Sequence, residues 1–285
     1  MKINGIKIHY VEAGEENKPL MVFVHGFPEF WFTWRYQLNY FKKNYRVVAL
    51  DNRGYNDSEK PPGIENYHIQ NLVDDVKALV EGLGVNKFTL VGHDWGGAIC
   101  WTFAALYPEL LDNLIICNCP HTLSLRDQRQ RGWEQKLKSW YIVFFQCPML
   151  PELFAMSEDM QNLENMLTDS GLKSESEEME AYKYAFREFE TWKGGMNYYR
   201  CAATRKSVDF WQDKNIQEKI RFIKVRTLEI FGTADKYLAV AGAQGSSKYV
   251  EDHTLELLEG VSHWVQQEAP DRVNMIMEKF LNEAK

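Results

Sequence analysis

Residues 88–100 read FTLVGHDWGGAIC, and this stretch decides the fold. Its apolar start predicts a buried strand, and its end predicts the first turn of a helix. The motif GHDWG (92–96) between them has the spacing of a sharp strand-to-helix turn that presents its central residue, Asp94, as a nucleophile. Gly92 and Gly96 leave the space that such a turn needs. An alternative is that Asp94 only caps the helix, which is a common use of aspartate.

Short apolar runs alternate with amphipathic ones along the rest of the chain. Alternating strands and helices predict an α/β fold, with a mostly parallel central sheet that helices cover on both faces. The expected strands are 6–11, 20–24, 45–50, 88–92, 114–119, 227–231 and 254–258, and the expected helices are 66–83, 96–107, 241–250 and 270–282.

One long interval interrupts this alternation. Residues 122–221 contain no convincing strand, while 128–139, 177–189 and 208–222 have helical patterns. A block of this size between two strands predicts an inserted helical domain rather than a loop. We call residues 122–221 the cap, and we expect residues 1–121 and 222–285 to form the core domain.

Composition narrows the class of protein. The 285 residues carry 33 Lys and Arg against 40 Asp and Glu, a formal charge of −7, and no long basic run, so nucleic-acid binding is not expected. We expect no integral membrane segment, because no apolar stretch is long enough to span a bilayer. Five cysteines without a CxxC pair, and no ligand set with metal spacing, favour a cytoplasmic protein without a metal site.

A second motif follows an earlier strand. Residues 22–29 read VFVHGFPE, and a strand that ends in His-Gly-x-Pro is the place where such folds position a backbone N–H beside the nucleophile. The N–H groups of Phe27 and Trp95 are therefore the candidate oxyanion hole. Pro28 is a candidate for a cis peptide bond. His25 is interpreted as a structural residue whose ring bonds the backbone.

An acid and a base are expected after two later strands. Residues 227–235 (TLEIFGTAD) end in Asp235, and residues 255–264 (LELLEGVSHW) carry His263. The order Asp94, Asp235, His263 is that of nucleophile, acid and base in α/β-hydrolases. The other slot for the acid holds Asn118, which cannot carry a negative charge.

Together these motifs resemble those of the epoxide hydrolases of the α/β-hydrolase fold. The resemblance rests on HGFPE (25–29), DNRGY (51–55), GHDWGG (92–97), Asp235 and SHW (262–264), and it extends from about residue 3 to the C-terminus. One departure is Asn56, where relatives usually have Gly, although Asn also tolerates a left-handed turn.

The resemblance implies further site residues. Two cap tyrosines that hold the epoxide oxygen map onto Tyr141 and Tyr199, with Tyr198 excluded because neighbours on a helix point in different directions. A lipophilic substrate pocket is expected around the aromatic and proline side chains of Phe27, Pro28, Trp34, Trp95 and Trp264.

The implied reaction uses water to convert a lipophilic epoxide, such as an epoxy fatty acid or an aryl epoxide, to a vicinal diol, in lipid metabolism or detoxification. It needs no cofactor, and we expect a monomer or homodimer. Two alternatives stay open: a haloalkane dehalogenase, although Phe27 stands where a halide donor is expected, and a non-catalytic ligand-binding protein. Asp94 at the apex of the turn excludes a serine hydrolase.

Overall fold

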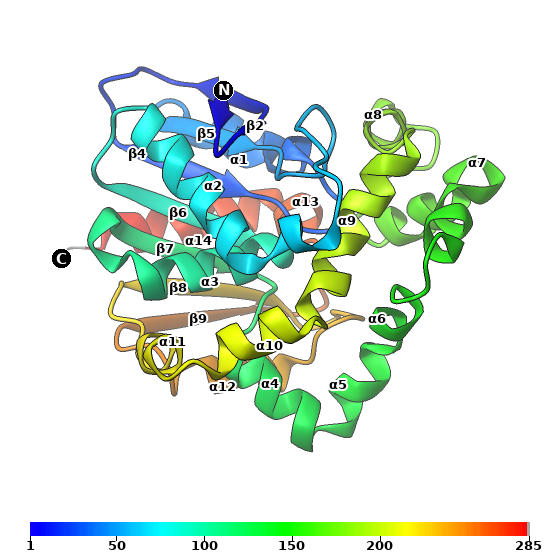
Figure 1. Ribbon diagram of the computed structural model, residues 1–285. Helices are drawn as coiled ribbons and strands as arrows, with labels where there is room; N and C mark the ends of the chain where they lie inside the picture. Colours follow the sequence, from blue (N-terminus) through cyan, green and yellow to red (C-terminus); the bar gives the residue numbers. More distant parts are fainter. Residues whose placement is uncertain (284–285) are drawn as a thin grey trace.

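The computed structural model describes residues 1–283, and its centre is a seven-stranded sheet (Figure 1). All neighbouring strands of this sheet are parallel except the first pair, so the predicted α/β class is confirmed. In spatial order the strands are β3 (Tyr10–Ala13), β5 (Arg46–Leu50), β4 (Leu20–Val24), β6 (Phe88–His93), β7 (Leu111–Cys117), β8 (Thr227–Gly232) and β9 (His253–Leu258).

Side chains of each strand alternate between two hydrophobic cores, one on each face of the sheet. In β4, Val22 and Val24 point into one core, and Met21 and Phe23 point into the other. Helices α2 (Ile69–Gly82) and α3 (Trp95–Leu106) cover the first face, and α1 (Arg35–Phe41), α13 (Val265–Glu268) and α14 (Pro270–Asn282) cover the second. Helix α12 (Val240–Ser246) packs beside β8. Burial on both faces explains why inner strands such as β4 (LMVFV) are wholly apolar, whereas the edge strand β9 (HTLELL) is not.

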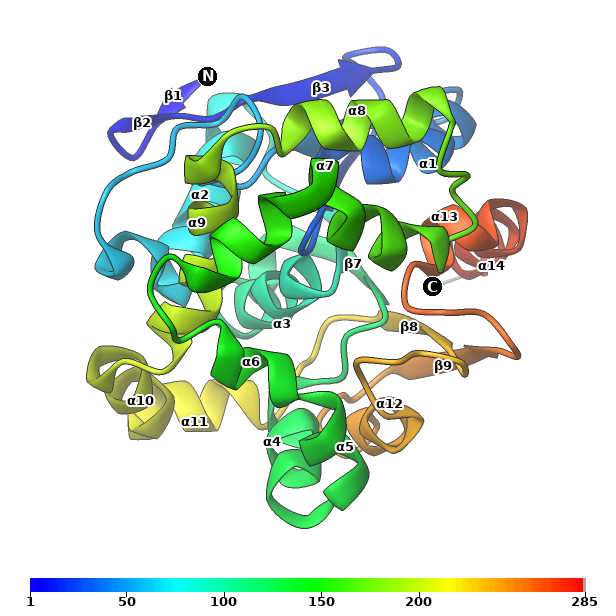
Figure 2. The same ribbon diagram turned by 90° about the vertical axis from the view of Figure 1, so that its right-hand side faces the viewer.

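The segment between β7 and β8 is helical, as predicted. Figure 2 shows its middle helices in front of the ends of the strands, above α3. Its first helix packs on α12 and its last on α3, so both ends of the segment lie against the core. The helices are α4 (Thr122–Arg131), α5 (Trp133–Lys138), α6 (Trp140–Phe144), α7 (Leu150–Thr168), α8 (Glu177–Ala185), α9 (Phe189–Ala202), α10 (Arg205–Gln212) and α11 (Lys214–Ile220). The exact limits of the cap, 122 and 221, stay a prediction.

Several predicted boundaries were wrong. The expected strand 6–11 is divided between β2 (Ile6–Lys7), which pairs with β1 (Lys2–Ile3) in a hairpin, and β3, which joins the large sheet. The expected helix 208–222 is two helices, because the Asp213 side chain accepts hydrogen bonds from the N–H groups of Asn215 and Ile216 and starts α11. Helix α7 was not predicted, and α9 was expected only at Tyr198 and Tyr199, which were placed on one helix. Helix α7 is interrupted at residues 157–160, three of which have positive φ, and this break obscures its periodicity.

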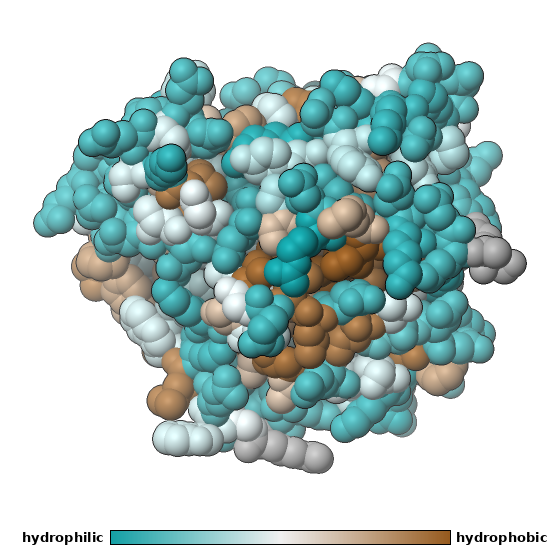
Figure 3. All heavy atoms as spheres, turned by 180° about the vertical axis from the view of Figure 1, so that it is seen from behind, coloured by the Kyte–Doolittle hydropathy of each residue, from teal (hydrophilic) through white to brown (hydrophobic). Residues whose placement is uncertain are grey.

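The back of the molecule is mostly hydrophilic, with apolar side chains gathered near its centre over the edge strand β9 (Figure 3). In the part of the chain that the structure describes, no helix has the length and apolar character needed to cross a bilayer.

Candidate active site

Asp94 stands at the end of β6, in a backbone conformation that side chains rarely adopt. Its φ of 50° and ψ of −119° lie outside the helical region, and its side chain makes no capping hydrogen bond to α3. Asp94 thus occupies the N-cap position of α3 without capping the helix through its side chain, so the alternative that it serves only as a cap is wrong. Close packing supports the turn, because a Cβ atom on Gly96 would lie 2.1 Å from the Val24 carbonyl oxygen, and one on Gly92 would lie 2.6 Å from the Gly96 carbonyl oxygen. The strain is held by its surroundings, as is usual at functional sites.

The first oxygen of the Asp94 carboxylate is held by the loop after β4. The Phe27 N–H donates a 2.9 Å hydrogen bond to Asp94 Oδ1. Gly26 makes this approach possible, since a Cβ atom there would lie 2.4 Å from the Asp94 Cβ. The Phe27–Pro28 peptide bond is cis. Trp95 is the first residue of α3, where the backbone N–H has no acceptor within the helix.

His25 belongs to the support of this loop. Its ring is buried, its Nδ1 lies 2.8 Å from the Gly26 carbonyl oxygen, and its Nε2 accepts a hydrogen bond from the Asn52 N–H. These backbone contacts are those expected of a structural histidine.

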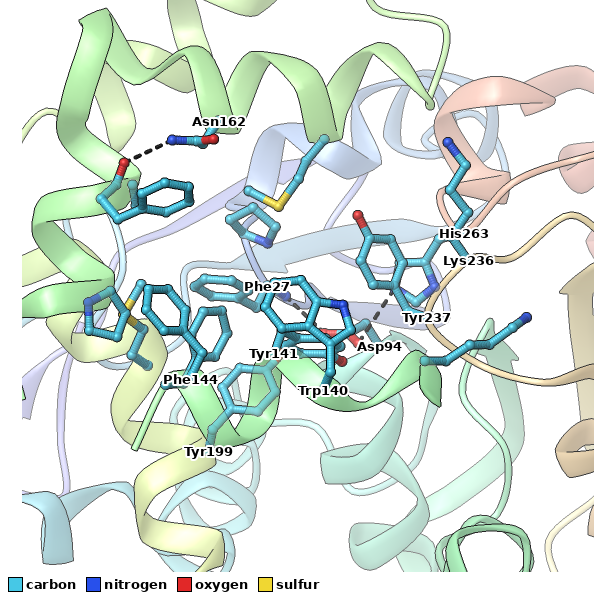
Figure 4. Close-up of a pocket in the computed structure, with 18 of the residues that line it drawn as sticks. Phe27, Asp94, Trp140, Tyr141, Phe144, Asn162, Tyr199, Lys236, Tyr237 and His263 are labelled. Carbon is cyan, nitrogen blue, oxygen red and sulfur yellow. Dashed lines mark hydrogen bonds and ion pairs between the residues drawn. The ribbon is translucent and has the colours of Figure 1, made fainter. Parts of the chain in front are cut away.

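The second oxygen of Asp94 faces His263. His263 Nε2 lies 3.5 Å from Asp94 Oδ2, and its Nδ1 lies 2.7 Å from Asp235 Oδ2. Burial by itself would lower the pKa of His263, but the two carboxylates outweigh it and raise the pKa to about 10. Figure 4 shows Asp94 between Phe27 and His263, with both contacts marked.

Asp235 is fully enclosed by donors. Its Oδ1 accepts hydrogen bonds from the N–H groups of Tyr237 and Leu238, and its Oδ2 accepts one from the Asn118 amide as well as contacting His263. Although burial opposes ionisation, the charge of His263 and these donors lower the pKa of Asp235. Asn118, at the other position considered for the acid, thus stabilises the Asp235 carboxylate through its amide N–H.

The cap brings two phenols over Asp94. Tyr141 of α6 and Tyr199 of α9 line the same cavity, with ring centroids 5.8 Å apart. Burial, together with the negative charge of Asp94, raises the pKa of both hydroxyls, so both stay protonated. Tyr198 points elsewhere and donates its hydroxyl hydrogen to the Arg53 carbonyl oxygen.

The cavity above Asp94 has a volume of about 600 Å³. Aromatic and aliphatic side chains from the cap form most of its wall, and Phe27, Pro28 and Trp264 line it as predicted. The prediction for Trp34 was wrong, since this side chain is fully buried against Phe23 in the core on the far side of the sheet. Trp95 does not line the cavity either, and its indole packs edge-on against the ring of Tyr199, at 5.1 Å between centroids.

A buried network behind the site was not predicted. Glu29 accepts hydrogen bonds from the Gly26 N–H, the Thr33 hydroxyl and the Gln266 amide, and contacts His93 Nδ1 at 2.7 Å. His93 Nε2 in turn lies 2.9 Å from the His263 carbonyl oxygen. Burial opposes the charge of Glu29, but His93 and the donors lower its pKa to about 2. The network thus joins the loop that holds Phe27 to the loop that holds His263.

Comparisons with known proteins agree with this geometry. A family model described as alpha/beta hydrolase fold matches residues 19–270. The chain is 40% identical to epoxide hydrolase 1 of Caenorhabditis elegans, over 99% of this chain and 69% of that protein, and 38% identical to human epoxide hydrolase 4, over 99% and 78%. The chain belongs to the epoxide hydrolases of the α/β-hydrolase fold.

A solved epoxide hydrolase has the same overall structure. The crystal structure of the Bacillus megaterium epoxide hydrolase with an inhibitor superimposes with a TM-score of 0.89 at 32% identity, over 99% of both chains. In residues 1–283 of this epoxide hydrolase, no group of three or more His, Cys, Asp or Glu side chains is arranged to hold a metal ion.

Proposed function

We propose that this enzyme hydrolyses lipophilic epoxides to vicinal diols through an ester intermediate on Asp94. The observation that carries the proposal is the position of Asp94, with one oxygen bonded to the Phe27 N–H and the other facing His263, beneath the tyrosine pair. Each group has a separate role in the two steps.

In the first step, Asp94 Oδ2 attacks a carbon of the epoxide ring and the carbon–oxygen bond of the ring breaks. The leaving oxygen is a poor anion and needs a proton, which Tyr141 or Tyr199 donates while the other phenol keeps its hydrogen bond. Because the pKa of each hydroxyl is raised, both are protonated at neutral pH when the epoxide arrives. The product of this step is a neutral ester on Asp94.

In the second step, neutral His263 takes a proton from water, and the hydroxide attacks the carbonyl carbon of the ester. Asp235 orients the imidazole and stabilises its charge. The Phe27 N–H holds the oxygen that becomes negative, and the Trp95 N–H at the start of α3 is placed to help. As this intermediate collapses, the imidazolium of His263 returns its proton to the departing diol oxygen, and the carboxylic acid formed at Asp94 loses its proton, which restores the carboxylate.

The cavity wall supports a lipophilic substrate. Aromatic and aliphatic side chains dominate the space above Asp94, including Phe144, Phe154, Met166 and Trp192. Phe27 supplies no side-chain donor where a halide would be released, whereas the phenols suit an epoxide oxygen. This arrangement favours epoxide opening over dehalogenation.

The decisive test follows oxygen in a single turnover. With enzyme in excess over a stilbene oxide in ¹⁸O-water, we expect the label in the peptide that contains Asp94 and an unlabelled diol. Label in the first diol would show direct attack of water on the ring and would refute the ester mechanism. Asp94→Ala should abolish turnover, and bromide release from bromoalkanes without diol formation would favour a dehalogenase instead.

A further inference from the structure

The edge of the cap exposes an unusual number of apolar side chains. Within residues 1–283, fifteen large hydrophobic side chains are exposed, and eight of them lie in residues 133–154. A monomeric protein rarely exposes such a concentration without a binding role. We call these eight residues the cap-edge patch: Trp133, Leu137, Trp140, Val143, Met149, Leu150, Leu153 and Phe154.

The cap-edge patch is continuous with the substrate cavity. Leu137, Trp140 and Phe154 belong to the patch and also line the cavity above Asp94. Figure 2 shows α5, α6 and the start of α7 along the front of the cap, and apolar side chains are also visible on the cap side, at the left edge of Figure 3. Whatever covers the patch therefore contacts three side chains of the cavity wall.

The charge around the patch is opposite to that of the rest of the chain. Residues 122–150 contain five Lys or Arg and two Asp or Glu, a net charge of +3, whereas the remaining residues carry −10. Arg126, Arg129 and Lys136 of this segment are exposed. The segment that follows, residues 151–185, has nine acidic and two basic residues. The positive charge of α4, α5 and α6 therefore lies beside the cap-edge patch. Residues 205–226, with seven Lys or Arg and three Asp or Glu, form a second basic segment, but none of the patch residues belongs to it.

We propose that the cap-edge patch docks the enzyme on an anionic lipid surface, with the cavity entrance facing the bilayer. Tryptophan side chains prefer the headgroup region, and the exposed Trp133 and Trp140 stand on this patch beside basic residues. Residues 158–180, which follow the patch and contain eight acidic residues and one basic residue, are repelled by the same surface and so fix the tilt of the docked cap. Entry of a lipophilic epoxide straight from the bilayer rests on the proposed function, whereas docking itself does not.

Vesicle sedimentation of the full chain tests the docking. We expect it to bind vesicles of phosphatidylcholine mixed with phosphatidylglycerol, to bind phosphatidylcholine alone much less, and to shift its tryptophan emission to shorter wavelength when bound. The double variant Trp133→Ser/Val143→Ser removes apolar area outside the cavity, and Tyr184→Ser/Phe222→Ser is its matched control elsewhere. We expect Trp133→Ser/Val143→Ser to weaken vesicle binding by roughly tenfold or more, and the control variant to bind as the wild type does.

A second pair of variants tests the charge. Arg126→Glu/Lys136→Glu reverses two exposed charges beside the patch, and Arg221→Glu/Lys224→Glu makes the same change in exposed residues outside it. We expect only the first pair to weaken binding to the anionic vesicles, by roughly tenfold or more, and added salt to weaken binding of the wild type.

Three outcomes would overturn the proposal: no binding to either kind of vesicle, equal binding by the patch variants and their controls, or a dimer in analytical ultracentrifugation that Trp133→Ser/Val143→Ser converts to monomer without any change in vesicle binding. The last result would assign the patch to a second copy of the chain. Diol formation from a water-miscible epoxide, measured in the same preparations, reports separately on the proposed function.

Discussion

Replacing Asp235 by Asn tests how the buried acid controls the second half of the reaction. The Asp235 carboxylate accepts hydrogen bonds on both oxygens, from two backbone N–H groups at Oδ1 and from Asn118 at Oδ2, where it also contacts His263. An Asn oxygen can satisfy the backbone groups, but its NH₂ then faces the Asn118 NH₂ and His263 Nδ1. His263 must turn Nδ1 into an acceptor and move its proton to Nε2, where it can no longer act as a base.

The expected decrease in the rate of ester hydrolysis follows from the electrostatics of His263. The carboxylates of Asp235 and Asp94 raise its pKa from 6.5 to about 10, which corresponds to about 5 kcal/mol of net stabilisation of the imidazolium. Once Asp94 is an ester, only Asp235 remains to stabilise the charge that develops as water is deprotonated. With the wrong tautomer as well, hydrolysis of the ester should slow by roughly 10³- to 10⁴-fold. Attack by Asp94 should slow far less.

Rapid-quench mass spectrometry separates the two steps. Asp235→Asn should accumulate protein heavier by one epoxide, while the wild type shows little adduct. In the wild type, the hydrolysis step should accelerate as pH rises, because His263 acts in its neutral form. Asp57→Asn, the same substitution at an exposed site, is the control. If both steps slow equally in Asp235→Asn and no adduct forms, or if diol formation is unchanged, the role given to Asp235 is wrong.

Four further substitutions probe other parts of the structure. Tyr141→Phe and Tyr199→Phe should each slow ester formation by roughly 10²-fold and together abolish it in single-turnover measurements, and activity in the double variant would contradict the oxygen-binding role. Burial outweighs the contact with His253 and raises the pKa of Glu229 from 4.5 to about 7. The free energy of unfolding therefore falls as pH rises from 4.5, and the full loss is reached above pH 7. Glu229→Gln should therefore increase the free energy of unfolding by about 3 kcal/mol at pH 8 and by little near pH 4.5, and urea denaturation showing a loss at pH 8 would contradict this. Trp34→Phe should lower the free energy of unfolding by about 1–3 kcal/mol and leave kcat/KM unchanged. A changed KM would instead show that Trp34 contributes to substrate binding.

Local sequence predicted the parts of the site whose geometry is set by a few neighbouring residues. The turn at Asp94 needs glycine at fixed distances on both sides, so its sequence is diagnostic by itself. The order of Asp94, Asp235 and His263 was informative because each residue follows a strand of the same sheet. Parallel strands end at one edge, and this brings residues far apart in sequence together.

Contacts that depend on packing across the sheet were beyond such reasoning. Trp34 follows the loop that holds Phe27, but it ends the short 3-10 helix Trp31–Trp34 that leads into α1, and its indole packs in the core on the α1 side of the sheet. Glu29 and His93 lie inside motifs that were recognised, yet their mutual contact joins two separate loops. The sequence could have predicted the contact between Glu29 and His93 only if the loop after β4 and the end of β6 were already known to lie side by side.

The charges of the site suggest how one step prepares the next. Before reaction, His263 lies between two carboxylates, and its raised pKa favours the imidazolium form, which cannot act as a base. Formation of the ester removes the charge of Asp94, so the pKa of His263 falls. The phenol that protonates the leaving oxygen becomes a phenolate, whose conjugate acid has a raised pKa. A proton therefore moves favourably from His263 to that phenolate through solvent, which restores the phenol and produces the neutral imidazole that hydrolysis needs. The base becomes active only after there is an ester for it to hydrolyse.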